Sequence, residues 1–171
     1  MLEAVAARTP APGGGSSAAW TCAVAAALVE MAARFAPEGS DEAGRAAELR
    51  AQAVQLAEIE LHAYEPVLEA LRLARDDPDR MARVDVARAT ASESPLAIAR
   101  VGAEVAQLAV DLVRTGNPNL VGDAIAGALL AEAAAQAAAR LVAINLTEGA
   151  SVREAAEFAR RAHEARDEAL S

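Results

Sequence analysis

Apolar residues dominate several long stretches of this chain, and their spacing predicts helices. The stretch over residues 16–36 is apolar on almost every side, with two strongly polar residues near its end. A helix of this kind is buried all round. We therefore place it at the centre of the domain or of an oligomer, with Ser16 or Ser17 capping its start and Pro37 ending it.

Four further helices follow from the same reasoning. Apolar residues spaced by three and four predict a helix over 40–75, kinked at Pro66, and another over 79–115, kinked or interrupted at Pro95. A break at 116–118 precedes a fourth helix to about Thr147, and a short charged fifth spans 152–170. We detect no internal repeat and no linker long enough to divide the chain. The prediction is an all-α, single-domain bundle of about five helices over residues 1–171.

The amino-acid composition supports this fold and excludes some classes of binding partner. The 171 residues are 54% hydrophobic but only 2% aromatic, and the strong helix formers Ala, Leu, Glu and Arg predominate. The net charge of −9 argues against a nucleic-acid or anionic-membrane surface, because phosphate binding needs clustered cations. All basic residues are Arg, so lysine chemistry is excluded. Cys22 is the only cysteine, which suits a cytoplasmic protein.

The apolar run over 18–29 has some features of a signal peptide. Glu3 occupies the region that should be basic, and Glu30 and Arg34 stop the run early. No stretch of the sequence reaches the roughly twenty strongly apolar residues of a membrane span. We expect a buried helix of a soluble protein.

Two glycine-containing turns each precede an apolar helix. The first is Pro-Gly-Gly-Gly-Ser at residues 12–16, where three glycines leave bare backbone amides at a helix start. The second is Gly-Asn-Pro-Asn-Leu-Val-Gly-Asp-Ala at residues 116–124. Neither is a Walker loop or a dinucleotide fingerprint, since no Gly-Lys-Ser/Thr follows and no strand precedes. One glycine turn alone is often only a turn, so the pair is the informative feature.

With Ile-Asn-Leu at residues 144–146, these motifs resemble those of the cyclodeaminase/methenyltetrahydrofolate cyclohydrolase family. Its members carry Pro-Gly-Gly-Gly-Ser, then Gly-Asn-x-Asn-x-x-Ser-Asp-Ala, then Ile-Asn-Leu, in the order and with the approximate spacing found here. The resemblance covers most of the chain. It implies a helical dimer whose substrate is a tetrahydrofolate derivative. A commonly acidic position in the family's second helix aligns best with Glu60.

Asp123 is the candidate catalytic residue, because it is a carboxylate on an otherwise apolar helix face. One interpretation is structural, in which Asp123 caps or braces a neighbouring helix start. The other is implied by the resemblance. Both family reactions move protons beside a cationic folate carbon, where a partly desolvated carboxylate can deprotonate water or stabilise the cation. Neither reaction requires a metal or a covalent nucleophile.

The substrate-binding candidates are the two turns and one amide near a helix end. In a dimer, the glycine turn of one subunit can meet the second turn and Asp123 of the other. Asn145 lies about 33 Å from Asp123 along a straight helix, so it joins them only from a partner subunit and otherwise braces a helix end. Dimerisation is also predicted from the apolar first and fourth helices. The candidates are Gly13, Gly14, Gly15, Ser16, Asn117, Asn119 and Asn145.

Departures from the family pattern leave a second hypothesis open. Gly122 stands where the family commonly has Ser, and Leu141 and Ala143 stand where it has an amide and a cation. The first hypothesis is a folate-dependent one-carbon enzyme, with cyclohydrolase activity ahead of cyclodeaminase because no formiminotransferase domain is attached. The alternative is a divergent, catalytically inactive helical dimer that binds a small metabolite or a partner protein.

The remaining titratable residues are expected to be solvated. His62 and His163 lie on charged helix faces and lack the spacing of a zinc helix. Glu58, Glu60 and Glu65 can supply a second carboxylate, but a solvated helix face is the favoured interpretation.

Overall fold

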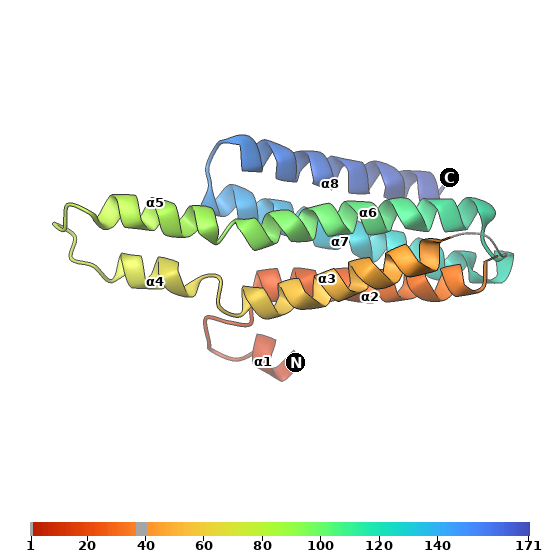
Figure 1. Cartoon of the computed structure of the whole chain (residues 1–171), viewed down its shortest axis with the longest axis horizontal. Coiled ribbons are helices and arrows are strands. Elements are labelled where there is room, and N and C mark those ends of the chain that lie inside the picture. Colours follow the sequence, from red (N-terminus) through yellow and green to blue (C-terminus); the bar gives the residue numbers. More distant parts are fainter. Residues whose placement is uncertain (1, 37–40) are drawn as a thin grey trace.

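The computed structural model describes residues 2–36 and 41–171, and every regular element in these ranges is helical (Figure 1). The predicted all-α fold is therefore confirmed. The elements are α1 (Leu2–Val5), α2 (Gly14–Arg34), α3 (Glu42–Glu60), α4 (Glu65–Leu71), α5 (Arg80–Thr90), α6 (Glu93–Thr115), a 3-10 turn η1 (Pro118–Leu120), α7 (Val121–Asn145) and α8 (Ala150–Ala169).

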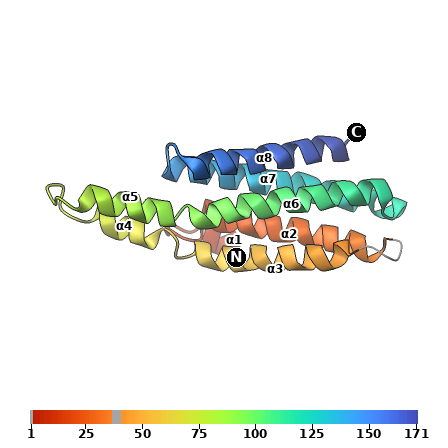
Figure 2. The ribbon, with the colours of Figure 1, turned by 45° about the horizontal axis from the view of Figure 1, so that its top comes forward.

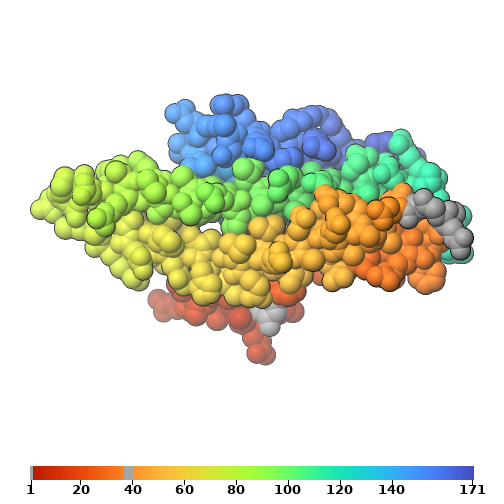
Figure 3. All heavy atoms as spheres, in the orientation of Figure 1, coloured from red at the N-terminus to blue at the C-terminus, as the bar shows by residue number. Residues whose placement is uncertain are grey.

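Helices α2, α3, α6 and α7 form the body of the molecule, and α8 lies along α6 and α7 (Figures 1 and 2). Helices α4 and α5 pack chiefly against each other. They project beyond the body as a two-helix arm, which tapers away at the left of the space-filling view (Figure 3). The turn between α7 and α8 requires Gly149, whose φ of +124° favours glycine.

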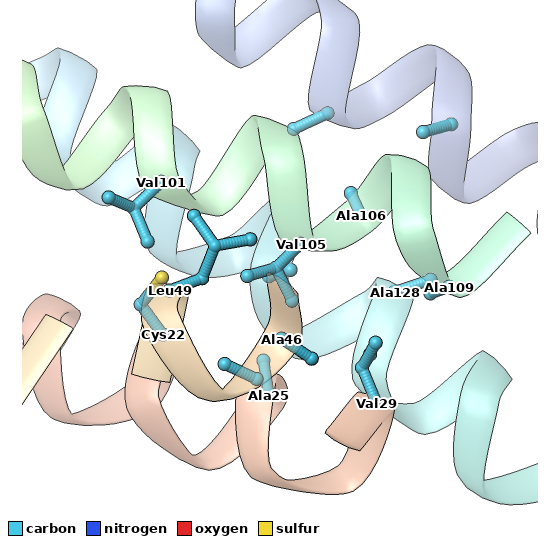
Figure 4. Close-up of a cluster of buried hydrophobic side chains, with 14 of the residues drawn as sticks. Cys22, Ala25, Val29, Ala46, Leu49, Val101, Val105, Ala106, Ala109 and Ala128 are labelled. Atoms are coloured by element: carbon cyan, nitrogen blue, oxygen red, sulfur yellow. The ribbon is translucent and has the colours of Figure 1, made fainter. Parts of the chain in front are cut away.

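Most buried hydrophobic residues are alanines, so the helices approach one another closely. A Cβ atom on Gly102 of α6 would lie 2.9 Å from the carbonyl oxygen of Ala131 on α7. Larger side chains, including Cys22 and Leu49, meet where α2, α3 and α6 converge (Figure 4). Burial raises the pKa of the Cys22 thiol to about 12, so this cysteine is an inert part of the core.

The helix predicted to be kinked at Pro66 and the helix predicted to be kinked or interrupted at Pro95 are each divided into two. Helix α3 ends at Glu60, and Pro66 lies at the start of α4. Helices α5 and α6 meet at residues 91–92, and Pro95 lies in the first turn of α6. Proline lacks an N–H, which a helix does not need in its first turn, so the chain breaks before each proline instead of kinking at it.

Glu132 and Gln136 form a polar stripe on the largely apolar α7, and this stripe lies in the seam between α7 and α8. The side-chain amide of Gln136 donates to the carbonyl of Ala159 at 3.3 Å. The Nδ1 atom of His163 lies 3.4 Å from Glu132, and this histidine is half exposed. These contacts place the stripe between two helices and account for it without a catalytic role.

By length and composition alone, the helical spans 14–34 and 118–145 are long and apolar enough to cross a bilayer. This differs from the expectation that no stretch of the sequence is apolar enough for a membrane span. Buried core helices meet the same criterion, and α2 packs against α3, α6 and α7. Its outward side nevertheless remains apolar, with Val24 about half exposed.

Candidate active site

A cavity of about 240 Å³ lies where α2 begins and where α3 and α7 end. Because α2 runs antiparallel to both neighbours, residues distant in sequence meet at this end of the body (Figure 2). We call this space the glycine-turn cavity. Its lining residues are Pro10, Ala11, Gly13, Gly14, Gly15, Glu60, Ala63, Tyr64, Ala91, Pro95, Leu141, Ile144 and Asn145.

The glycine turn leaves the first amides of α2 without a side-chain cap. Gly13, rather than Ser16 or Ser17, occupies the N-cap position, and no side chain caps the start of α2. Ser17 instead donates its hydroxyl to the Gly13 carbonyl at 2.8 Å. The Ser16 hydroxyl is buried and has no hydrogen-bond partner among the described residues. Unsatisfied donors at a helix start indicate a binding place for a polar ligand group.

Glu60 brings a carboxyl group directly against this turn. It is the last residue of α3, and its carboxylate accepts a hydrogen bond from the hydroxyl of Ser94 on α6. A Cβ atom added to Gly15 would overlap the Oε2 atom of Glu60. The absence of a side chain at position 15 therefore makes room for the carboxyl group.

The environment of Glu60 disfavours its charged form. Burial raises the pKa of the Glu60 carboxyl above its ordinary value, and the Ser94 hydrogen bond offsets part of that rise. The position at a helix C-terminus is also unfavourable for a negative charge. A carboxyl group kept in such a place is a candidate for proton-transfer chemistry.

The structure brings several predicted site residues together within one chain. Gly13, Gly14, Gly15 and Asn145 all line the glycine-turn cavity, although Asn145 was expected to need a partner subunit. The reason is that the end of α7 lies beside the start of α2. A Cβ atom on Gly14 would lie 3.8 Å from the side chain of Leu141, one turn before Asn145.

The second predicted turn lies at the opposite end of the body (Figures 1 and 2). Asn117 accepts a hydrogen bond from the backbone amide of Asn119 at 3.0 Å and so closes η1. Asp123 is half-buried in the first turn of α7, where a negative charge suits the helix dipole. Within one chain, Asp123 lies about 33 Å of helix away from Asn145.

Glu60 is the functional candidate that sequence reasoning set aside. Glu58 and Glu65 are exposed, as expected, but the solvated-face interpretation is wrong for Glu60. The available signal was the alignment of Glu60 with a commonly acidic position of the family. Its burial depends on contacts with the glycine turn and α6, which helical periodicity does not encode.

The residues of this site can transfer protons and form hydrogen bonds. The lining contains one carboxyl-bearing residue, Glu60, together with the three glycines of the turn and Asn145, and it includes no Arg or His. Within the described ranges, no three His, Cys, Asp or Glu side chains group closely enough to hold a metal ion. Glu60 is thus the one charged residue of the lining, which suits a ligand with a positively charged centre.

The fold and this cavity define a class of all-helical proteins with a carboxyl-lined pocket at one end of a helical bundle. Comparison with known proteins identifies the family within that class. The family model described as formiminotransferase-cyclodeaminase matches residues 1–165, and the chain belongs to this family. The resemblance seen in the sequence motifs is thereby confirmed.

Two individual proteins are similar over most of the chain. A methenyltetrahydrofolate cyclohydrolase from Methylorubrum extorquens strain AM1 is 31% identical over 160 residues, covering 85% of this chain and 76% of that protein. The crystal structure of a formiminotetrahydrofolate cyclodeaminase from Thermotoga maritima matches with a TM-score of 0.87 and 25% identity. This match covers 98% of the present chain and 90% of the other.

Proposed function

We propose that this protein acts on the one-carbon bridge of a tetrahydrofolate derivative, with methenyltetrahydrofolate cyclohydrolase as its first activity. The observation that carries the proposal is the Glu60 carboxyl group, partly buried and held by Ser94 against the glycine turn. The cyclohydrolase of Methylorubrum extorquens supports the choice of reaction. The proposed substrate is the only cofactor-like molecule required, and no metal takes part.

In 5,10-methenyltetrahydrofolate, the bridging carbon shares a positive charge with N5 and N10. The Glu60 carboxylate takes a proton from water as the water oxygen bonds to this carbon. The carbinol then loses one of its two bridging C–N bonds, and Glu60 returns the proton to the departing nitrogen. The remaining hydroxyl proton leaves to solvent as the formyl group forms. A raised pKa suits this cycle, because the carboxyl must both accept and return a proton.

The other residues of the site bind and orient the substrate in this proposal. Gly14, Gly15 and Asn145 line the same cavity, where the glycine amides and the asparagine side chain can hold the polar edge of the pterin. Ser16, although predicted as a binding residue, is not among the residues that line the cavity, and its hydroxyl is buried. No cation lines the cavity, so no like charge repels the positive charge of the bridge.

Formiminotetrahydrofolate cyclodeaminase activity is the second candidate, favoured by the likeness to the Thermotoga maritima structure. In that reaction N10 bonds to the formimino carbon and ammonia leaves. Protonated Glu60 would supply the proton that the leaving nitrogen needs, and a raised pKa favours this protonated form. Assaying both substrates with the same preparation separates the two activities.

We also propose a homodimer, formed through the outward sides of α2 and α7 beside α1. Trp20, Val24 and Leu130 line a small apolar depression there, together with Leu2 and Val5 of α1. Ile144, which lines the glycine-turn cavity, is 72% exposed, so the cavity opens where an apolar side chain remains uncovered. In a two-fold dimer with antiparallel subunits, the partner's α7 start approaches this opening. Asp123 then has the role predicted for it only as a residue contributed from the second copy.

The alternative of an inactive binding protein is less well supported. It leaves the raised pKa of Glu60 and the uncapped glycine turn without a purpose, although both cost stability. Leu141 replaces a polar side chain in the lining of the glycine-turn cavity, but the Glu60 carboxyl group and its hydrogen bond to Ser94 are kept.

The proposal is tested by following the loss of methenyltetrahydrofolate absorbance with wild type and Glu60→Gln. We expect kcat to fall by about 100-fold or more, the usual contribution of a general acid–base group. Glu58→Gln is the matched control, because Glu58 is exposed on the same helix and lines no part of the cavity. Equal rates for Glu60→Gln and wild type would exclude the role of Glu60, and a wild-type rate no higher than buffer would exclude the enzyme.

A further inference from the structure

A second cavity adjoins the glycine-turn cavity on the side of the two-helix arm. It has a volume of about 540 Å³ and shares Pro10, Ala11 and Tyr64 with the first. The shared residues come from the N-terminal segment and from the turn between α3 and α4. We call this space the outer cavity. Arg72, at the C-terminal end of α4, forms part of its lining.

The two cavities differ in charge. The glycine-turn cavity has Glu60 as its one charged lining residue, whereas the outer cavity has Arg72, His62, Glu65 and Glu69. Glu65 already contacts the Nδ1 atom of His62 at 3.0 Å. The guanidinium of Arg72 has no ion-pair partner in the part of the chain that the structure describes. Glu69 likewise has no ion-pair partner among the described residues, so the lining offers an incoming anion one guanidinium, that of Arg72, beside one unpaired carboxylate.

We propose that the outer cavity holds the acidic tail of the folate substrate, with Arg72 binding a carboxylate and Tyr64 packing on the aromatic ring. This inference rests on the proposed function and extends it to the other half of the substrate. A tetrahydrofolate is a linear molecule in which a p-aminobenzoyl ring joins the reactive pterin to a glutamate. With the one-carbon bridge at Glu60, the ring passes the wall that both cavities share, and the glutamate enters the outer cavity.

Tyr64 occupies the right place for the middle of such a ligand. It is the only tyrosine in a chain with very few aromatic residues, and it lines both cavities while remaining 43% exposed. An exposed aromatic face favours contact with another aromatic ring. Beyond it, the planar fork of an arginine matches the geometry of a carboxylate. The three protein groups thus lie in the same order as the parts of the substrate that they contact. Glu60 is at the bridge, Tyr64 at the p-aminobenzoyl ring and Arg72 at the glutamate.

Arg72→Gln tests the assignment. We expect KM for 5,10-methenyltetrahydrofolate to rise about tenfold through loss of one charge-assisted contact, with kcat unchanged because Arg72 is remote from the bridge. Arg75→Gln removes the same charge from an exposed residue that lines neither cavity, and should leave KM unchanged. Tyr64→Leu should also raise KM, and Tyr64→Phe, which keeps the ring, should restore it.

The dimethyl ester of the same substrate isolates the charge of the tail. Wild type should show a KM about tenfold higher for the ester than for the acid, and Arg72→Gln should show similar values for both. An unchanged KM for Arg72→Gln with the acid, or a wild type that does not distinguish acid from ester, would overturn the assignment.

Binding of 5-formyltetrahydrofolate, measured by calorimetry, separates this inference from the proposed reaction. A wild type that binds this compound but turns over neither substrate would contradict the reaction, while a weaker Kd for Arg72→Gln would still support the tail site. A protein that turns over substrate with the same KM in wild type and Arg72→Gln would contradict the tail site alone. Failure of wild type to bind 5-formyltetrahydrofolate would overturn the tail site as well.

Discussion

Glu60 and Gly15 depend on each other, because the carboxyl group of one fills the space that a side chain on the other would need. This relation explains a glycine in the first turn of α2 by sterics, without appeal to backbone flexibility. The carboxyl group keeps its hydrogen bond to Ser94 only while that space remains open.

Gly15→Ala should therefore impair catalysis while leaving the fold intact. The new methyl group displaces the Glu60 carboxyl, and a misplacement of about 1 Å can cost roughly 100-fold in rate. Gly122→Ala is a matched control, since Gly122 is likewise the second residue of its helix and an added Cβ meets nothing within 4 Å. The measurements are kcat and the free energy of unfolding. A Gly15→Ala enzyme as active as Gly122→Ala would contradict the steric argument.

The sequence predicted the glycine turn and Asn145 as site residues because their motifs are contiguous and distinctive. It could not predict that Asn145 meets the turn within one chain, since that depends on α7 running antiparallel to α2. The proposed role of Glu60 was equally hidden. Neighbouring glutamates on α3 look alike in sequence, and only packing against the glycine turn separates Glu60 from Glu58.

At the scale of elements, an ion pair joins α2 to α3. Glu30 is buried, and its carboxylate accepts hydrogen bonds from Arg50 on α3 at 2.7 Å and from Arg34 on its own helix at 2.6 Å. Hydrogen bonds from Arg50 and then Arg34 hold the pKa of Glu30 below its ordinary value, against the opposing effect of burial. The pair thus stabilises the charged form of Glu30 in the folded state.

Arg50→Ala should lower the free energy of unfolding at pH 7 by about 1 kcal/mol, because Glu30 loses its interhelix partner but keeps Arg34. The stabilisation by a lowered pKa is complete above the ordinary carboxyl pKa of about 4.3 and disappears as pH falls through the lowered value. The difference in unfolding free energy between Arg50→Ala and wild type should therefore be smaller at pH 3 than at pH 7. Denaturant unfolding at pH 3 and pH 7 measures this difference.

Arg160→Ala is the control for this prediction. Arg160 contacts Glu157 and Glu164 entirely on the exposed side of α8, where ion pairs contribute little. We expect no measurable change in its unfolding. A loss for Arg50→Ala that is equal at pH 3 and pH 7 would show that packing of the arginine stem, and not the charge of Glu30, is responsible.

Element boundaries show what helical periodicity can and cannot provide. The apolar pattern correctly gave an all-helical chain and the approximate extent of α2, α7 and α8. It joined α3 to α4 and α5 to α6, because the spacing of apolar residues continues through the turns. Pro66 and Pro95 carried the missing information, since each marks the first turn of a new helix.

For the whole molecule, the proposed dimer is the central expectation. Val24→Glu or Leu130→Glu would place a charge in the apolar depression between α2 and α7, and should shift a dimer towards monomer in light scattering at micromolar concentration. Met81→Glu on the exposed side of the arm should leave the dimer unchanged. A wild-type monomer at that concentration would refute the dimer.

Measuring kcat for Asp123→Asn and for the dimer-disrupting variants decides the role predicted for Asp123. If the partner subunit supplies this carboxylate, Asp123→Asn lowers kcat, and disruption of the dimer lowers it as well. If Asp123→Asn has the kcat of wild type, Asp123 has no catalytic role. Its charge then serves only to interact favourably with the dipole at the start of α7. Sequence alone could not place Asp123, because its distance from the glycine turn depends on how two copies associate.

The alanine-rich core described above also has a thermodynamic consequence for the molecule as a whole. Alanine has no side-chain torsion to immobilise, so ordering this core costs backbone entropy and almost no rotamer entropy. Each alanine also removes little apolar surface from water. The heat capacity change of unfolding should then lie at or below the usual value of about 12–15 cal/mol/K per residue. A small heat capacity change flattens the stability curve, so the folded state loses stability only gradually as temperature moves away from its optimum.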